Sequence, residues 1–227
     1  MFRKYLYLHP MALIRSQYQD ELDGVSQSLV DLTNMVTTSV VKASKAVQSA
    51  DLALAEEVIA ADVKIDDFQH ELDARIIDII ARQQPVASDL RALVTAMRMS
   101  ADLERMGDLA HHIAKVARLR HPDCAIPEVL LLPFTEMGHV AEKLSIMVGN
   151  VITTRDTDMA LQVEKDDDEM DDLHRKVISG IISNGSTITI ESAIDLTLLG
   201  RYYERFADHA VAVARRVYFL VKGEFPA

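Results

Sequence analysis

The feature that most constrains the fold is an internal repeat, in which one helical pattern of apolar residues returns one hundred positions later. The first copy has apolar residues three or four apart, which is typical of one face of an α-helix. A neighbouring segment repeats in the same way at an offset of 105, so the chain contains two copies of one multi-helix unit. The matched residues are Leu103, Met106, Ala110, Ile113 and Ala117 with Tyr203, Phe206, Ala210, Val213 and Val217, and Ile65, Phe68, Leu72 and Ile76 with Met170, Leu173, Val177 and Ile181.

The repeat predicts an all-α fold of two tandem three-helix bundles, six long helices in all. Eight glycines and six prolines are few for this length, which favours long helices over a β-fold with many turns. Asp51 and Asp156 are expected N-caps of equivalent helices, and Ser88 an N-cap of the third helix. The fourth helix is expected to start near Glu136, after a proline-containing linker. The predicted domains are an extension at 1–10, a first repeat at 11–121, a linker at 122–134 and a second repeat at 135–227.

Composition excludes several classes of function. The formal net charge of −11 disfavours general nucleic-acid binding, because phosphate backbones are repelled. Cys124 is the single cysteine, so there is no disulfide framework, and it is expected to be a linker residue. No apolar run is long enough to span a bilayer, which favours a cytoplasmic protein. Residues 1–10 are expected to be an extension or to lie upstream of a true start at Met11.

Acidic pairs recur with the repeat, and they are the strongest candidate for a functional site. Each pair has two carboxylates at i and i+4, on one face of a helix, and the pairs on the third helix of each unit are predicted to point away from the core. Like charges at this spacing destabilise an isolated helix by about 0.2–0.5 kcal/mol, so four converging acids favour a bound cation. Carboxylate oxygens suit hard cations, here iron, manganese, magnesium, zinc or calcium. The candidate ligands are Asp62, Asp66, Glu104 and Asp108 in the first unit, and Asp167, Asp171, Glu204 and Asp208 in the second.

Other interpretations of these acids stay open. They could form a solvated acidic face of a metal-free helical scaffold. They could also belong to a carboxylate-bridged di-metal enzyme, but such a site needs histidine ligands that follow the repeat. His111, His139 and His174 do not follow it, and they are expected to be surface residues. His209, next to Asp208, is kept as a possible auxiliary ligand. No nucleophile, phosphate-binding loop or dinucleotide motif is present, so we predict that the protein is not an enzyme.

At these same residues the chain resembles the PhoU family of phosphate-transport regulators. The motifs that carry the resemblance are Arg82-Gln-Gln-Pro-Val-Ala-Ser-Asp-Leu-Arg91, Ala101-Asp-Leu-Glu-Arg-Met-Gly-Asp108 and Arg201-Tyr-Tyr-Glu-Arg-Phe-Ala-Asp-His209. The family's common Gly-Asp-His sequence is Gly107-Asp108-Leu109 in the first unit and Ala207-Asp208-His209 in the second, so the two sites are expected to differ.

The resemblance implies both an architecture and a role. It implies two three-helix bundles related by a pseudo-twofold axis, with multinuclear metal sites at the eight acids named above. It also implies a negative regulator of the phosphate-starvation response (the Pho regulon), which links the ATPase subunit of the Pst phosphate importer to a PhoR-type sensor kinase. A homodimer is expected, together with membrane association only through these partners.

Overall fold

Six long α-helices make up the chain, and no strand occurs in the described part. A computed structural model describes the backbone of residues 10–226 and the side chains of residues 17–226. The predicted extension at 1–10 therefore lies almost wholly outside the described residues. The helices are α1 (Pro10–Ser49), α2 (Leu52–Gln83), α3 (Ala87–Arg120), α4 (Glu128–Thr154), α5 (Thr157–Ser183) and α6 (Ile190–Lys222).

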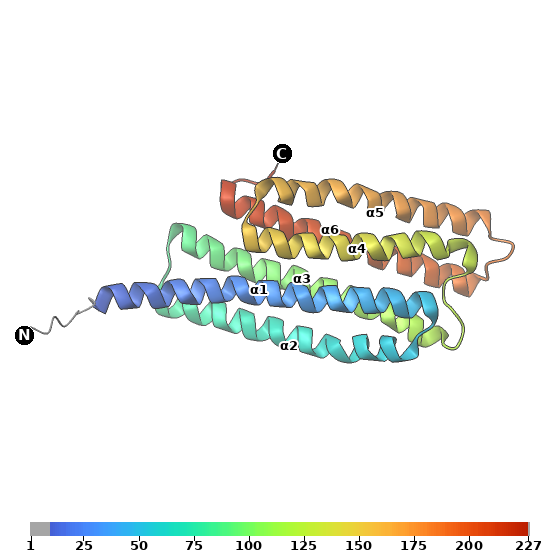
Figure 1. The fold of residues 1–227 in the computed structure, drawn as a ribbon, viewed down its shortest axis with the longest axis horizontal. Coiled ribbons are helices and arrows are strands. Elements are labelled where there is room, and N and C mark those ends of the chain that lie inside the picture. Colours follow the sequence, from blue (N-terminus) through green and yellow to red (C-terminus); the bar gives the residue numbers. More distant parts are fainter. Residues whose placement is uncertain (1–9, 227) are drawn as a thin grey trace, which may run out of the picture.

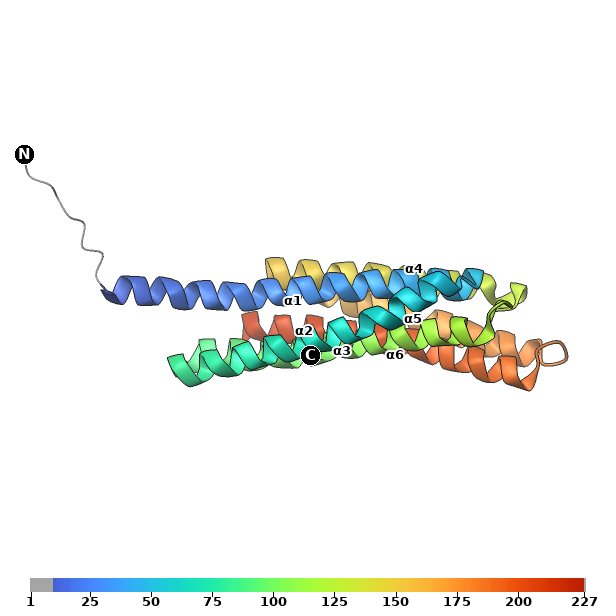
Figure 2. The same cartoon turned by 90° about the horizontal axis from the view of Figure 1, so that it is seen from below.

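The helices form two three-helix bundles that lie side by side along their length (Figure 1). Helices α1, α2 and α3 pack on one another, and α4, α5 and α6 do the same. The bundles meet through α1 against α4 and α3 against α6, whereas α2 and α5 lie on the outside (Figures 1 and 2). The predicted all-α fold of two duplicated three-helix bundles is confirmed.

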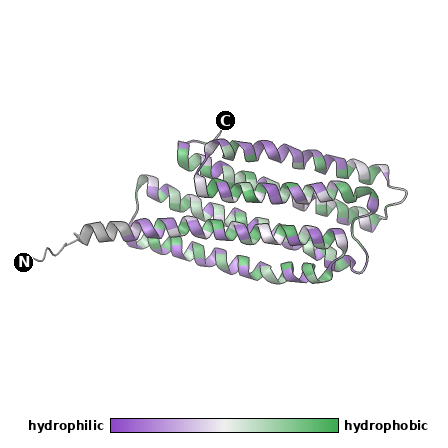
Figure 3. Ribbon diagram, in the orientation of Figure 1, coloured by the Kyte–Doolittle hydropathy of each residue, from purple (hydrophilic) through white to green (hydrophobic). Residues whose placement is uncertain are grey.

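The repeated apolar pattern forms the core. Leu103, Met106 and Ala110 on α3 are fully buried, and so are their counterparts on α6. Green apolar and purple polar positions alternate along the helices in Figure 3, as expected of helices with one buried side. Tyr203 is the largest buried side chain, and its hydroxyl donates a hydrogen bond to Ser44 Oγ at 2.8 Å. That bond crosses from α6 to α1, so the core joins the two bundles and is shared by them.

The turn between the first two helices of each bundle is also repeated. Asp51 caps α2 by accepting a hydrogen bond from the Leu54 amide, and Asp156 caps α5 by accepting from Asp158 and Met159. Both predicted N-caps are confirmed. The residue before each cap has a positive φ, 53° at Ala50 and 56° at Arg155. The offset of 105 thus holds for backbone conformation as well as for apolar pattern.

Two predicted boundaries are wrong. The fourth helix begins at Glu128, not near Glu136, so Pro133 lies inside it and the linker is 121–127. Leu130, Phe134 and Met137 are buried at helical spacing on both sides of the proline, and their packing outweighs the lost hydrogen bond. Helix α3 begins after Val86, which has no side-chain cap, so Ser88 is not the N-cap.

A polar seam joins α3 and α6 in the interface between the bundles. Asp102 on α3 accepts from His209 Nδ1 at 3.1 Å and from Arg216 Nε at 2.7 Å. Further along the antiparallel pair, Arg120 contacts Asp195, which is only 7% exposed. His209, predicted as an auxiliary ligand beside Asp208, bonds through Nδ1 to Asp102 in the other bundle, and its ligand role stays a prediction.

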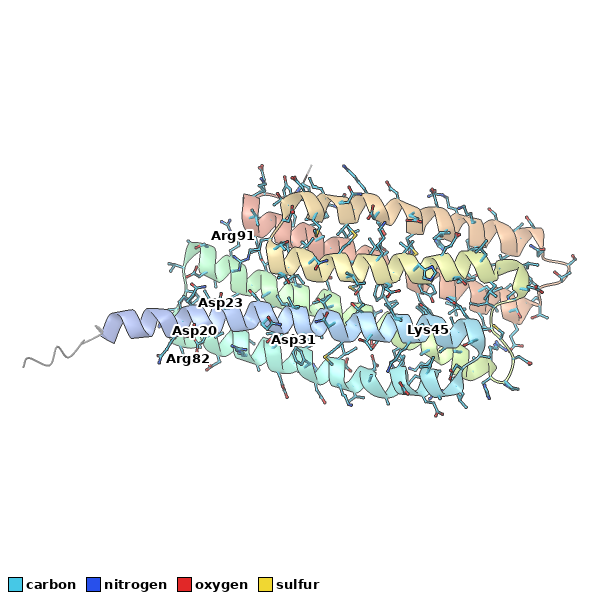
Figure 4. All side chains as sticks on the ribbon, in the orientation of Figure 1. Asp20, Asp23, Asp31, Lys45, Arg82 and Arg91 are labelled. Atoms are coloured by element: carbon cyan, nitrogen blue, oxygen red, sulfur yellow. The ribbon has the colours of Figure 1, made fainter. Side chains whose placement is uncertain are left out.

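Charged residues cover the outer surface of α1 and the end of α2. Figure 4 labels Asp20, Asp23, Asp31 and Lys45 along α1 and Arg82 at the end of α2. Arg82 bonds to Glu21 of α1 at 2.8 Å, which ties the two helix ends together. None of the described helices is both long and apolar enough to cross a membrane.

Candidate metal-binding acidic clusters

Each bundle brings its four predicted acids to one pair of packed helices. The first cluster consists of Asp62 and Asp66 on α2 with Glu104 and Asp108 on α3. The second cluster consists of Asp167 and Asp171 on α5 with Glu204 and Asp208 on α6. Helices α2 and α3 pack together, as do α5 and α6, so both clusters lie between an outer and an inner helix.

Two acids of the first cluster, Glu104 and Asp66, have a raised pKa. Burial raises the pKa of Glu104, and the charges of Asp108 and Asp66 raise it further. Burial likewise raises the pKa of Asp66, with added repulsion from Asp62 and Asp108. Each of these groups is therefore affected by acids on both helices. The prediction that two i,i+4 pairs converge across neighbouring helices agrees with this arrangement.

The second cluster shows the same effect more strongly. Burial, followed by repulsion from Asp171 and Asp208, raises the pKa of Asp167 to about 7. The pKa of Glu204 is also raised, by burial first and then by Asp208. A carboxyl group that titrates near neutral pH is disfavoured as an anion by burial and by nearby negative charge, and a bound cation would favour the ionised form.

Burial differs among the eight acids. Asp62 is buried, whereas Asp171 and Asp208 are exposed and the other five are intermediate. The expectation of two outward-facing clusters is therefore wrong for Asp62. One carboxylate oxygen in each cluster, Asp62 Oδ1 and Glu204 Oε2, is buried without a hydrogen-bond partner. Buried polar atoms normally have partners, so these two oxygens mark where a ligand would be stabilised.

The acids are close, but they are not arranged as the ligands of a single ion. Within the described side chains, no three His, Cys, Asp or Glu residues are grouped as metal ligands would be. Two of the acids bind arginines of their own helix instead, Asp108 with Arg105 and Glu204 with Arg201. The donor set and the two unpartnered oxygens fit a hard cation, and binding requires these arginine contacts to open.

Each cluster also has a histidine nearby, although both histidines were predicted to be surface residues. His111 on α3 is largely buried; its Nδ1 binds Asp62 Oδ2, and its Nε2 has no partner. His174 on α5 lies close enough to Glu204 to act on its charge, and a Cβ atom added at Gly200 would lie 3.1 Å from its ring. The repeat did not reveal them because they come from different helices, an inner one in the first bundle and an outer one in the second. The signal available in the sequence was the spacing of Asp108 and His111 at i,i+3.

Gly107, between the acids of the first cluster, allows α2 and α3 to approach closely. A Cβ atom there would lie 3.0 Å from Ile65 Cγ2 and 3.1 Å from its Cδ1. We expect Gly107→Ala to lower the free energy of unfolding by about 1 kcal/mol, because crowding exceeds the gain in helix propensity. Urea unfolding measures this difference.

Gly149→Ala is the matched control for that substitution. Gly149 also lies inside a helix, but its added Cβ would meet Thr33 Cγ2 at an ordinary 3.6 Å. It should stabilise the protein by about 0.5–1 kcal/mol through helix propensity alone. If both substitutions stabilise the protein equally, close approach is not the reason for Gly107.

Comparison with known proteins identifies the doubled unit. A family model described as the PhoU domain matches residues 29–117 and again residues 134–217. The phosphate-specific transport system accessory protein PhoU homolog 2 of Mycobacterium bovis is 42% identical over 213 residues, covering 94% of this chain and 100% of that protein. The corresponding PhoU homolog of Rhizobium meliloti is 29% identical, covering 95% of this chain and 91% of that protein.

Two solved structures have the same fold over almost their whole length. The crystal structure of PhoU from Pseudomonas aeruginosa matches with a TM-score of 0.81 and 27% identity, covering 91% of this chain and 100% of that one. The phosphate transport system regulatory protein PhoU from Streptococcus pneumoniae matches with a TM-score of 0.83 and 25% identity, covering 92% and 99%. The similarity therefore extends through both bundles and the linker.

Proposed function

Because this chain belongs to the PhoU family, as its motifs predicted, we propose that it is a metal-binding regulatory adaptor of phosphate homeostasis. The observation that carries the proposal is the match of the PhoU domain to both bundles, with one acidic cluster in each. Full-length similarity to accessory proteins of a phosphate transport system supports the same role.

Membership of a family of transport accessory proteins confirms the prediction that the chain is not an enzyme. The di-metal enzyme considered from the sequence is therefore set aside. The metal-free scaffold remains the alternative to a metal-binding adaptor, and the grouping of the acids favours the adaptor. Burial, followed by the charges of neighbouring acids, raises the pKa of Glu104 and of Asp167, and such costly carboxylates have no structural benefit on a bare scaffold.

The proposed partners are the ATPase subunit of the Pst phosphate importer and a PhoR-type sensor kinase. The protein would act in the cytoplasm as a negative regulator of the Pho regulon, and would reach the membrane only through these partners. Two long bundles side by side support this role, because they offer separate helical surfaces to two proteins at once (Figures 1 and 2).

Pull-down from cells grown at high and at low phosphate tests the adaptor function. The tagged chain should retain the importer ATPase and the sensor kinase, with amounts that change with phosphate. Deletion of the gene for this chain should also raise expression of the starvation-response genes, because their negative regulator is then absent. If neither partner is retained at either phosphate level, the adaptor proposal is wrong.

For the metal, the proposed ligands are the eight acids of the two clusters. A bound divalent or trivalent cation would supply positive charge where the carboxylates repel one another. Asp62 and Glu204 would bind through their unpartnered oxygens, and His111 and His174 lie beside the clusters as further donors. Iron, manganese, magnesium, zinc and calcium all accept such oxygen donors.

We expect Asp108→Asn with Asp208→Asn to reduce the metal content of the purified protein by at least about half, because each change removes charge from one cluster. Added cation should raise the Tm of the unchanged protein, by an amount corresponding to about 2.7 kcal/mol at one hundred times Kd. Elemental analysis and thermal unfolding measure both effects.

Asp67→Asn with Asp172→Asn is the control for the metal experiment. These two acids are exposed, lie on the same outer helices and are related by the same offset, but they lie outside the clusters. Their removal should leave metal content and the cation-dependent Tm unchanged. Equal loss in both double variants would mean that any bound cation is held by general surface charge.

We also propose a homodimer, since the exposed sides of long helices suit self-association. Light scattering at micromolar concentration should give twice the mass of one chain. A mass of 25.3 kDa, that of a single chain, would refute it.

A further inference from the structure

A pocket at one end of the molecule has no role in the function proposed so far. Its volume is about 520 Å³, within the range of ligand pockets, and it lies between the ends of α1, α3, α4 and α6. This is the end where Figure 4 labels Asp20 and Asp23 on α1 and Arg91 on α3. We call it the end pocket.

The end pocket is apolar inside and polar at its rim. Leu29, Leu93 and Met99 line it and are each at most 3% exposed. Gln19 and Ser88 lie at the rim and are exposed to solvent. The lining thus offers apolar contact with a few hydrogen-bonding groups, which suits a ligand that is mainly apolar and extended.

The internal repeat gives the end pocket a counterpart at the opposite end of the molecule. Ile152 and Arg155 of the pocket correspond, at the offset of 105, to Val47 and Ala50. The linker between the bundles covers that counterpart position. His121 Nδ1 donates to the Ala50 carbonyl at 3.1 Å, and the Cys124 thiol donates to the Val47 carbonyl at 3.5 Å.

The linker buries two apolar side chains at this end of the molecule. Ala125 and Ile126 are 7% and 3% exposed and belong to the hydrophobic core. They lie in a segment without helical structure, just before the N-cap Pro127 of α4. An extended segment with a small and a branched apolar residue is therefore the kind of chain that this position accepts.

Residues 223–226 follow α6 as the linker follows α3, but they do not fill the end pocket. After α6 the chain turns back, and Phe225 stacks on Phe219 with ring centroids 4.6 Å apart. Arg215 contacts the Pro226 carbonyl. Phe219 and Arg215 do not line the pocket, whose α6 residues are Val217, Leu220 and Val221. The C-terminal residues up to 226 thus lie on another side of α6.

We propose that the end pocket binds an extended apolar peptide segment of a partner protein, by analogy with the linker, which buries Ala125 and Ile126 at the opposite end. The proposal rests on the adaptor function proposed above, since it gives that function one docking position. A small or β-branched apolar side chain would enter between Leu93 and Met99. The peptide backbone would bond at the rim, where Gln19, Ser88 and Arg155 are available.

A synthetic peptide with the linker sequence Pro122–Glu128, carrying Cys124→Ser, tests this directly. Titrated into methyl-labelled protein, it should give saturable NMR shifts for Met99 and Ile152 and none for Met170, which is buried in the other part of the core. A peptide with Ile126→Asp should bind at least tenfold more weakly, because the apolar side chain is lost.

Two variants of α3 separate pocket binding from general effects. Ala92→Phe places a ring in the pocket and should abolish the shifts, whereas Val94→Phe adds the same bulk outside the lining and should not. Should Ala92→Phe fail to fold, the titration of the unchanged protein still decides. The proposal would be overturned if no NMR shifts appeared at millimolar peptide, or if the linker peptide and its Ile126→Asp variant gave equal shifts. It would also be overturned if the shifts were centred on Ile194, at the end of the molecule where the linker lies.

The pull-down described above keeps the two proposals distinguishable. Partner retention without peptide binding would refute the end pocket alone. Peptide binding without retention of either partner would refute the adaptor function alone. If both hold, Ala92→Phe should reduce retention of one partner at least fivefold, and Val94→Phe should not.

Discussion

Asp102→Ala is expected to lower the free energy of unfolding by about 2–4 kcal/mol, the largest effect of any single acidic residue described above. Asp102 holds both His209 and Arg216 across the interface between the bundles, and its side chain is 14% exposed. Removing it leaves the guanidinium of Arg216 without its partner in a largely buried position. At this chain length the loss corresponds to a fall in Tm of about 4–16 °C.

The pKa of Asp102 gives this prediction a pH dependence. Burial alone would raise it, but the bonds from His209 and Arg216 outweigh burial, so the pKa is lowered. Because the pKa of Asp102 is lower in the folded state, its ionised form stabilises the protein at pH values above the ordinary aspartate pKa. This stabilisation is lost as the pH falls below that value. The difference between wild type and Asp102→Ala should therefore narrow below about pH 4.

Asp23→Ala is the control for Asp102→Ala. Asp23 is exposed and accepts one bond from Gln19 of its own helix, at 3.1 Å. Its removal should change stability by less than about 0.5 kcal/mol. Thermal unfolding of both variants at pH 7 measures the contrast. If the two variants have the same Tm, the polar seam between α3 and α6 does not stabilise the interface between the bundles.

Asp167→Asn is expected to stabilise the metal-free protein by about 1–2 kcal/mol at pH 8, although it replaces a predicted ligand. Burial first, and then the charges of Asp171 and Asp208, raise the pKa of this carboxyl to about 7, so its ionisation costs free energy in the folded protein. One pKa unit corresponds to about 1.4 kcal/mol. Partial exposure of Asp167 screens the repulsion, so we expect less than the full shift would give.

The gain from Asp167→Asn should depend on pH in one direction. The unfolded chain releases the Asp167 proton near pH 4, whereas the folded chain retains it until about pH 7. Wild-type stability therefore falls between these values, and the benefit of Asn grows from near zero at pH 4 to its full size above pH 7. Unfolding with a chelator present, at pH 4, 6 and 8, measures this gain.

Asp172→Asn is the control for Asp167→Asn. It lies on the same helix, is exposed and pairs with Arg175 at the surface. It should shift stability by less than about 0.5 kcal/mol at every pH. A pH-independent gain for Asp167→Asn would contradict the repulsion inferred for the second cluster. With cation present the sign should reverse, because the variant then lacks a ligand.

The acidic clusters show how much of a site the repeat can predict. The offsets placed Glu104 with Glu204 and Asp66 with Asp171, and the structure brings each set of four together. Conversely, Asp62 is buried against His111, and Asp108 is bound to Arg105. The contact of Asp62 with His111 depends on the rotation of α2 against α3, which spacing along one helix does not give. The pair of Asp108 with Arg105 lies at i,i+3 on α3, so its spacing was visible in the sequence, but which partner Asp108 takes was not.

The sequence by itself determined the helices, their duplication, most of their ends and which side of each faces the core. Those properties depend on neighbours within a few turns, where apolar spacing and caps decide. Only the tertiary structure decided that the bundles join through α1 with α4 and α3 with α6, that His209 bonds to Asp102, and that one end is closed by the linker while the other holds a pocket. Such contacts join residues about one hundred positions apart, and their geometry is set by how whole helices pack.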